Sequence, residues 1–300
     1  MPKKVTKIHS PLRLQVDNLY DLQKVRVMME LRIYAYIKRL GLDKDHIKVK
    51  ALKKDSDALK AVEVSINKML KTELMEYPIY VNALKLIKGL AGPRIAGGII
   101  AWTEHYNEET NKIEGIERFD NISKYWKYCG LDVVIDKNTG EGHAPKKVRG
   151  EKAMWNSKLR MHLLFKVGEQ MIKTDNYFQK LYRDIKKHYV NIHPNPICDC
   201  GNIVTVTSSK AGQGYKIFNL DGEKHKCGVV KPRIKYTKGH IHNMARRRMI
   251  KILVADIWII WRKLEGFSVT LPYGMKEGIH SELIYPPEWA HFFKEVKRNE

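Results

Sequence analysis

Residues 84–96 read LKLIKGLAGPRIA, and this stretch decides how the chain is organised. Apolar residues recur on both sides of a glycine-rich turn, which predicts two short helices joined as a helix-hairpin-helix. Gly89 and Gly92 let the backbone turn sharply and approach a ligand closely. The amides that open the second helix, with Lys88 and Arg94, offer donors and positive charge to a phosphate. Glycines are also common in ordinary helix–helix turns, so a purely structural role is the alternative.

The chain before this stretch predicts a helical hairpin over residues 1–80. Ser10 and Pro11 are typical of a helix start, and Gly41 of its end. A basic linker is expected over 43–54, after which Asp55 or Ser56 would cap a second helix. Its apolar residues alternate in steps of three and four, as in a coiled coil, which predicts a hairpin seam or a homodimer contact. They are Leu59, Val62, Ile66 and Met69.

The chain after this stretch predicts three further regions. Residues 81–196 carry the helix-hairpin-helix, a loop-rich part after Trp102, a short helix over 123–129 and a basic helix from about Gly150 to Thr174. Residues 197–230 alternate like two strands around a glycine turn, and residues 231–300 hold a long basic helix and a tail that packs back through Trp289. The expected fold is therefore mainly α, with a small zinc-ribbon-like β insert in its C-terminal helical region.

The charge of the chain favours a polyanionic partner. The 300 residues include 55 Lys and Arg against 33 Asp and Glu, a formal net charge of +22. An acidic or neutral metabolic enzyme is not expected with this excess, whereas neutralised phosphates release counterions and so drive binding to nucleic acid. A Lys-rich thermophile surface would raise Glu together with Lys, which is not the case here. The residues expected to contact nucleic acid are Lys88, Gly89, Gly92, Arg94, Lys152, Lys158, Arg160, His240, Arg246, Arg247 and Arg248.

Two short pairs of soft ligands bracket the β insert. Cys198 and Cys200 form one pair, and His225 and Cys227 form the other. Four such ligands satisfy tetrahedral zinc, and a closed set is typical of a structural site. Reduced cysteines in a small hairpin are the alternative, since Cys-x-Cys is less specific than Cys-x-x-Cys.

Several blocks, taken in order, resemble one family of mobile-element proteins. From about Asp57 to Gly266 the chain is similar to the C-terminal half of the DEDD transposases of the insertion-element-110 type, whose relatives include the pilin-gene inverting recombinases. The matching blocks are the turn at 89–96, Arg118-Phe119, residues 125–131, residues 156–160 and residues 243–247. The resemblance implies DNA recombination as the biological setting.

The departures from that family bear on catalysis. Its members carry an N-terminal RuvC-like domain with four metal-binding acids, and the first 56 residues here predict helix without such strands. The family also has a nucleophilic serine in the loop after the block that residues 125–131 resemble, and the nearest candidate here is Thr139. A threonine needs an activating base or metal, so Thr139 is interpreted as a turn residue and no catalytic residue is assigned.

The function predicted from the sequence is transposase-like DNA binding without cutting by the chain alone. An active recombinase or nuclease is one alternative, although His240 and His242 open a basic helix rather than sit on a nuclease hairpin. An RNA-binding ribonucleoprotein component is another. The N-terminus lacks a signal-peptide pattern, and the longest apolar run is too short to cross a bilayer. We therefore expect a cytoplasmic, nucleoid-associated protein with no membrane partner.

Overall fold

The fold is mainly α-helical, as the sequence predicts. The computed structural model describes residues 10–136, 140, 142–195, 198, 200–208, 215–225, 237–270 and 283–294. The helical elements are α1 Pro11–Lys38, α2 Ile47–Leu74, α3 Pro78–Asn82, η1 Leu84–Leu86, α4 Pro93–Thr103, η2 Ile116–Arg118, α5 Ile122–Tyr128, α6 Ser157–Met161, the π-helical η3 His162–Val167, α7 Gly168–Lys173, α8 Tyr177–Ile192, α9 Lys238–Leu264, η4 Pro287–Trp289 and α11 Ala290–Phe293. The strands pair as antiparallel hairpins: β1 His105–Asn107 with β2 Lys112–Glu114, β3 Val134–Ile135 with β4 Gly142–His143, and β5 Val204–Ser208 with β6 Tyr215–Asn219.

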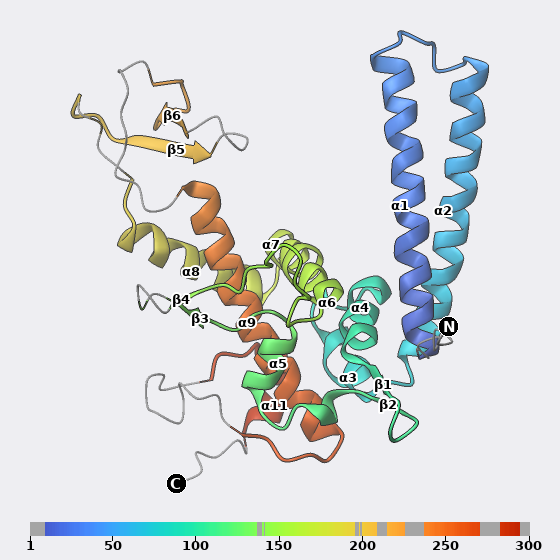
Figure 1. Cartoon of the computed structure of the whole chain (residues 1–300), viewed down its shortest axis with the longest axis vertical. Helices are drawn as coiled ribbons and strands as arrows, with labels where there is room; N and C mark the ends of the chain where they lie inside the picture. Colours follow the sequence, from blue (N-terminus) through green and yellow to red (C-terminus); the bar gives the residue numbers. More distant parts are fainter. Residues whose placement is uncertain are drawn as a thin grey trace.

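The two N-terminal helices form a long hairpin that projects from the body (Figure 1). The Ser10 hydroxyl caps α1 by accepting the Arg13 amide at 3.1 Å, as expected of an N-cap. Each helix has 28 residues, which corresponds to about 42 Å. The second helix begins at Ile47 with His46 as its cap, so the prediction of a linker over 43–54 was wrong. Lys and Ala in this run are good helix formers, and packing on α1 extends the helix through them.

The hairpin buries a seam that only partly coincides with the predicted one, in which Leu59 and Ile66 are half-buried and Ile66 packs against the core. Val49, Ser56, Glu63 and Leu70 are buried on α2 at intervals of seven residues. In contrast, Val62 and Met69 of the predicted seam are 46% and 55% exposed. The buried row carries a hydroxyl and a carboxylate in its middle, and such polar positions fix the register between paired helices. The pattern of apolar residues alone therefore placed Val62 and Met69 wrongly and missed the polar members of the buried row.

The predicted glycine turn forms between η1 and α4. The amides of Leu90 and Ala91 both donate to Ile87 O, at 2.9 and 3.2 Å, which closes the turn. Gly89 has φ +99°, in the left-handed region, and a Cβ there would lie 2.6 Å from the Met171 side chain. The helix before the turn is two short pieces, α3 and η1, while α4 follows the turn as expected.

A buried histidine holds α4 against the rest of the molecule. His162 lies at the start of the π-helical turn, and its Nε2 lies 2.9 Å from Ile95 O of α4. Its Nδ1 is 3.1 Å from the hydroxyl of Tyr20 on α1. Burial lowers the pKa of His162 to about 4, so the ring is neutral and can accept at one nitrogen while donating at the other. Gly98 leaves room for this ring, since a Cβ would lie 2.5 Å from it.

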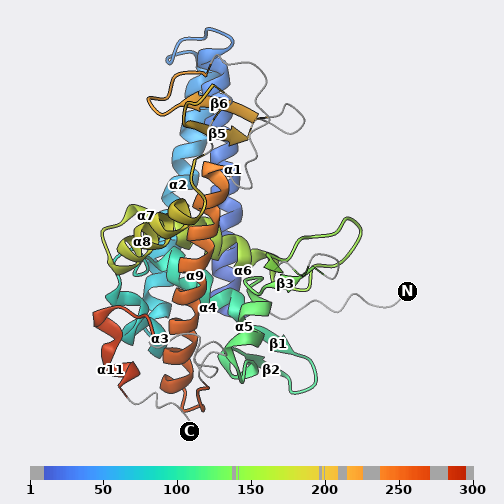
Figure 2. The ribbon, with the colours of Figure 1, turned by 90° about the vertical axis from the view of Figure 1, so that its left-hand side faces the viewer.

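The long helix α9 forms the axis of the core (Figure 2). Residues 253–262 of α9 are all buried, and α9 as a whole packs among α3, α5, α7 and α8. Trp258 donates its indole N–H to Phe119 O at 2.9 Å. The tail returns as predicted: Trp289 is fully buried and donates to Ala83 O at 3.1 Å. Within the part of the chain that the structure describes, no helix combines the length and apolar character that crossing a bilayer requires.

One prediction about the middle of the chain was wrong. The basic helix does not begin near Gly150: the Asn156 side chain caps α6, which starts at Ser157. Lys152 therefore lies in the extended connection before the helix. The loop-rich region after Trp102 also holds the short hairpin of β1 and β2.

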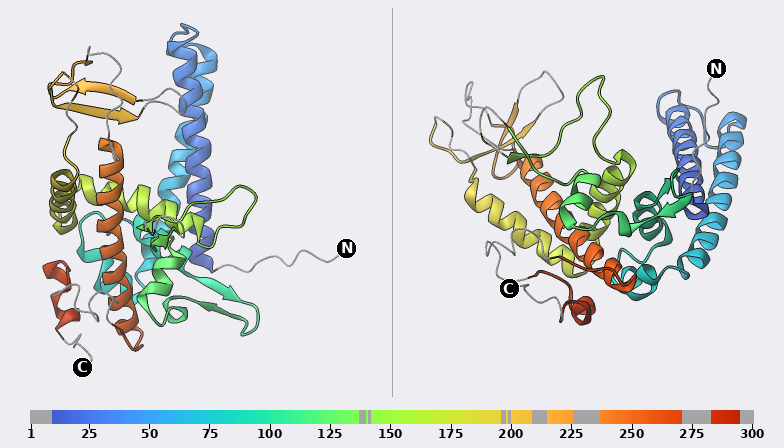
Figure 3. Two further views of the ribbon diagram at one scale, coloured as in Figure 1. Left: turned by 60° about the vertical axis from the view of Figure 1, so that its left-hand side comes forward. Right: turned by 60° about the horizontal axis from the view of Figure 1, so that its bottom comes forward.

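The β insert is present as a hairpin. β5 and β6 pair in register from Val204 opposite Asn219 to Ser208 opposite Tyr215. The insert and the α1–α2 hairpin rise from the same side of the helical body, at opposite ends of it (Figure 3).

Candidate functional site

Three side chains of the β insert form a group that can hold a metal ion. The ligand atoms of Cys198, Cys200 and His225 all lie within 4.8 Å of one another. His225 Nε2 is 3.2 Å from Cys198 Sγ and 3.5 Å from Cys200 Sγ. Cys198 is buried, His225 is half-buried and Cys200 is exposed. Two thiols and an imidazole are ligands that suit zinc.

The surrounding backbone fixes these three ligands. The Gly201 amide donates to Cys198 O at 2.8 Å, and Gly201 has φ +83°, which gives a tight turn after the two cysteines. Opposite it, the His225 amide donates to Ile217 O at 3.0 Å and so extends the strand pairing past β6.

Asn219 orients the imidazole, a role that the sequence did not indicate. Its Oδ1 lies 2.6 Å from His225 Nδ1, so this nitrogen carries the hydrogen and Nε2 presents its lone pair to the thiols. A histidine that binds a metal commonly has such a partner on its other nitrogen. A hydrogen-bonding residue on the strand before the histidine is the only signal, and it is a weak one. Cys227, the predicted fourth ligand, lies outside the described residues.

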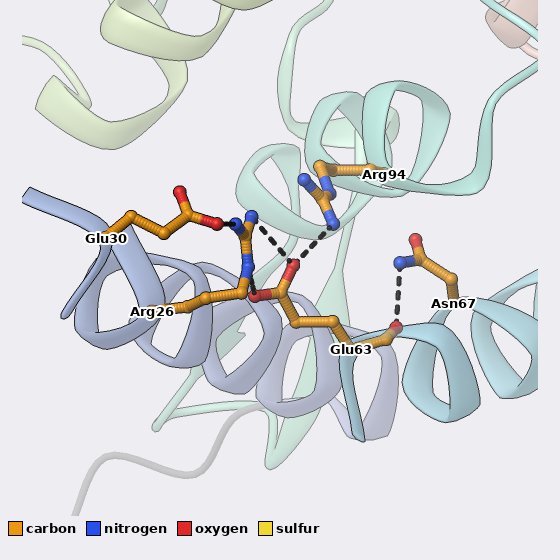
Figure 4. Close-up of polar contacts among 5 residues, drawn as sticks. All are labelled: Arg26, Glu30, Glu63, Asn67 and Arg94. Carbon is orange, nitrogen blue, oxygen red and sulfur yellow. Dashed lines mark hydrogen bonds and ion pairs between the residues drawn. The ribbon is translucent and has the colours of Figure 1, made fainter. Parts of the chain in front are cut away.

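Arg94 at the glycine turn is held by an ion pair rather than directed outward (Figure 4). Its guanidinium is 3.3 Å from Glu63 Oε2, and Arg26 lies 2.6 Å from the other oxygen of the same carboxylate. Glu63 is buried on α2, so this network joins both helices of the hairpin to the first turn of α4. Lys88 and Gly92 at the same turn are exposed. Gly92 has φ −66°, and open space lies where a Cβ would be, so this glycine is not required by the turn geometry.

A fully exposed basic segment, residues 146–152, runs before α6. Its cations are Lys146, Lys147, Arg149 and Lys152, and its acid is Glu151. Within the described residues none of these four cations forms an ion pair. Arg160 of α6 donates to Pro145 O at 3.0 Å, which ties the start of the segment to the body.

Some of the predicted contact residues on α6 and α9 are exposed, and others are held by contacts within the protein; we call the latter the engaged residues. Lys158 is exposed and pairs with Asp17 at 2.8 Å, while Arg248 and His240 are exposed on α9. Arg246 is buried, lies 2.6 Å from Glu169 and covers the Phe165 ring, so its first role is structural. Arg247 is half-buried and donates to two backbone oxygens.

His242, near the start of α9, is held by contacts within the protein. His242 Nδ1 is 2.6 Å from the Tyr182 hydroxyl, and its Nε2 is 3.7 Å from Glu169. Burial lowers the pKa of His242, and the nearby Arg246 lowers it further. These contacts join α7, α8 and α9. Thr139, the weak candidate nucleophile, lies outside the described residues.

Comparison of the chain with protein-family models, with curated proteins and with solved structures finds no match.

Proposed function

We propose that this protein binds duplex DNA through its phosphate backbone, as a transposase-like binding unit that does not cut DNA alone. The observation that carries the proposal is the exposed basic segment 146–152, whose four cations have no carboxylate partner among the described residues. An exposed cation free of an intramolecular pair is available to a phosphate, and the net charge of +22 adds long-range attraction.

The predicted contact residues contribute to this surface in two ways. Exposed Lys88, Lys152, Lys158 and Arg248 are available to contact phosphates directly. The engaged residues, among them Arg94 and Arg246, hold the elements that present these cations.

The test is a titration of the full-length protein with duplex DNA at several salt concentrations. We expect affinity to fall steeply with salt, because each neutralised phosphate contributes a slope of about −0.9 in log K against log salt. Changing Lys146 and Lys147 to Gln removes two contacts and should reduce the slope by about two. The matched control changes Lys186 and Lys187 of α8, which are also exposed.

Two results would contradict the proposal. One is affinity that does not depend on salt, and the other is an equal loss in the segment variant and the α8 control. Competition with an RNA duplex of the same sequence decides between DNA and RNA: stronger binding to RNA would replace DNA as the partner while leaving the basic surface in place.

We also infer that the metal group binds a structural zinc ion with Cys198, Cys200 and His225, and with Cys227 as fourth ligand. The alternative is a metal-free group of two reduced cysteines and a histidine. The orientation of the His225 ring by Asn219 favours a bound metal over that alternative. Metal analysis should find a single zinc per chain, lost in Cys198→Ser. Because the group lies at the end of the insert, a strong chelator should expose residues 197–230 to protease while the helical body keeps its Tm. A chelator-insensitive digestion pattern and no bound zinc would contradict this inference.

A further inference from the structure

Two arginines from different helices meet at the glycine that ends α5. Arg247 of α9 donates to Gly130 O at 3.1 Å and to Asp132 O at 2.7 Å. Arg160 of α6 also packs against Gly130, where a Cβ would lie 2.7 Å from Arg160 Cδ. Arg160 also donates to Pro145 O. Backbone oxygens therefore hold both guanidinium groups.

A lysine completes this group one turn further along α9. Lys251 lies four residues after Arg247, and its Nζ is 4.2 Å from the centre of the Trp126 ring. The Trp126 indole in turn donates to Lys251 O at 3.0 Å, which fixes the ring under the lysine. Arg160 has a matching support, with its guanidinium carbon 4.5 Å from the centre of the Trp155 ring. We call Arg160, Arg247 and Lys251 the Gly130 cation cluster.

The cluster is held together against its own charge. Burial lowers the pKa of all three cations; Arg160 further lowers the pKa of Arg247, and Arg247 that of Lys251. Like charges four residues apart on a helix are themselves destabilising. Asp132 acts in the opposite direction on each of them. Nevertheless, within the described part of the chain no carboxylate lies within ion-pair distance of any of the three.

Donors remain available in the cluster for a ligand. Among the described residues, nothing accepts a hydrogen bond from Lys251 Nζ or from the second terminal nitrogen of Arg160. Arg247 donates from both terminal nitrogens to backbone oxygens, which fixes its guanidinium, and its main contribution to a ligand is its charge. A small anion with several oxygens would accept from the first two residues and neutralise all three.

We propose that the Gly130 cation cluster is a phosphate-binding site formed by Arg160, Arg247 and Lys251. The source of the phosphate rests on the proposed function, in which it is a phosphodiester of the DNA backbone; binding of the phosphate group itself does not. The position of the cluster fits that source, because the exposed basic segment begins directly after Pro145, to which Arg160 is bonded. A DNA strand that lies along residues 146–152 would bring one of its phosphates to the Gly130 cation cluster.

Lys251→Gln tests the site, because it removes a charge that repels Arg247 and also removes a group that would bind phosphate. The first change should leave Tm unchanged or raise it, and the second should lower the affinity for DNA. In phosphate-free buffer the variant should have an unchanged or higher Tm, since mutual repulsion falls. Its affinity for duplex DNA should fall about tenfold, as expected for the loss of a charged hydrogen bond. Lys251→Arg keeps the charge and should retain most of the affinity. The control is Lys180→Gln, an exposed lysine of α8 with the same change in charge.

A second arm separates the site from the proposed function. Inorganic pyrophosphate should raise the Tm of the wild-type protein and of Lys180→Gln, and should leave the Tm of Lys251→Gln unchanged. If pyrophosphate behaves in this way but DNA does not bind, the site stands and the proposed function is wrong. If DNA binds but Lys251→Gln and Lys180→Gln behave alike in both arms, the proposed function stands and the site is wrong. A lower Tm for Lys251→Gln without either specific loss would make the lysine structural and would also overturn the site.

Discussion

Asp256 is a carboxyl group inside the helical core without a hydrogen-bond partner among the described residues. It is 2% exposed, lies on α9 among apolar side chains, and its Oδ2 is buried and unpartnered. Burial raises the pKa of Asp256 well above its usual range. An ionised carboxylate is costly there, so the folded state retains a proton that the unfolded chain releases at lower pH.

Asp256→Asn should therefore stabilise the protein increasingly as pH rises. The folded pKa of Asp256 is raised, so its contribution to stability is present below the unfolded pKa near 3.8 and is lost as pH rises through the folded pKa. Between those values the free energy of unfolding of the wild type should fall by about 1.4 kcal/mol per pH unit relative to the variant. Urea unfolding at about pH 5 and about pH 8 measures the gap. An equal gap at both pH values would contradict the assignment.

At the scale of elements, substitutions at the two glycines of the turn distinguish an effect on stability from an effect on DNA binding. Gly89 has a positive φ and faces Met171, so Gly89→Ala should lower the free energy of unfolding by about 1–2 kcal/mol. Gly92 has an ordinary φ and open space, so Gly92→Ala should cost less than about 1 kcal/mol, as for an altered N-cap. In the proposed function Gly92→Ala should weaken DNA binding more than its small effect on stability explains. Thermal unfolding and DNA titration of both variants check this pair, and the reverse pattern would show that Gly92 has no contact role.

Elements with local signals could be predicted from the sequence. Ser10 caps α1, and Gly130 and Gly266 end α5 and α9 with positive φ, because caps and turns depend on neighbouring residues. The strands around residues 204–219 follow from their alternation. In the candidate metal group, the types and spacing of Cys198, Cys200 and His225 predict that these side chains lie together. The structure confirms that they do.

Features that depend on distant partners could not be predicted in the same way. Glu63 lies in the buried row of α2 because Arg26 and Arg94 pair with it, and neither is its sequence neighbour. From the sequence alone, Glu63 is expected to face solvent, so the predicted seam left it out. The Gly130 cation cluster likewise joins α6 and α9 through backbone oxygens, and backbone contacts leave no pattern in the side chains.

At the scale of the whole molecule, the outer end of the α1–α2 hairpin exposes large apolar side chains among cations such as Lys38, Arg39 and Lys48. Leu31 and Leu40 of the first helix and its turn are 63% and 65% exposed, and Ile47 at the start of α2 is 78% exposed. A second copy of the chain, docked tip to tip, would cover these residues, whereas the homodimer contact expected from the sequence is the seam of Leu59, Val62, Ile66 and Met69.

Leu31→Glu should then weaken self-association without lowering Tm. Burying a leucine contributes about 1.5–3 kcal/mol, so the dimer should dissociate at least tenfold more readily. Sedimentation of the full chain over a range of concentrations measures this, with Leu14→Glu at the base of α1, 50% exposed, as the control. A monomeric wild type, or the same change in both variants, would exclude the tip as a dimer contact.

The α1–α2 hairpin extends well beyond the point where Glu63 and Arg94 join it to α4. Residues 47–62 of α2 lie beyond that ion pair and span about 24 Å, so a tilt of about 10° at the base of the hairpin would move its tip by about 4 Å. Tyr20 and Asp17 of α1 also bond to His162 and Trp102, so several contacts besides the Glu63 carboxylate hold that base. A partner that binds the tip would therefore act at a distance on Arg94 and on the glycine turn beside it.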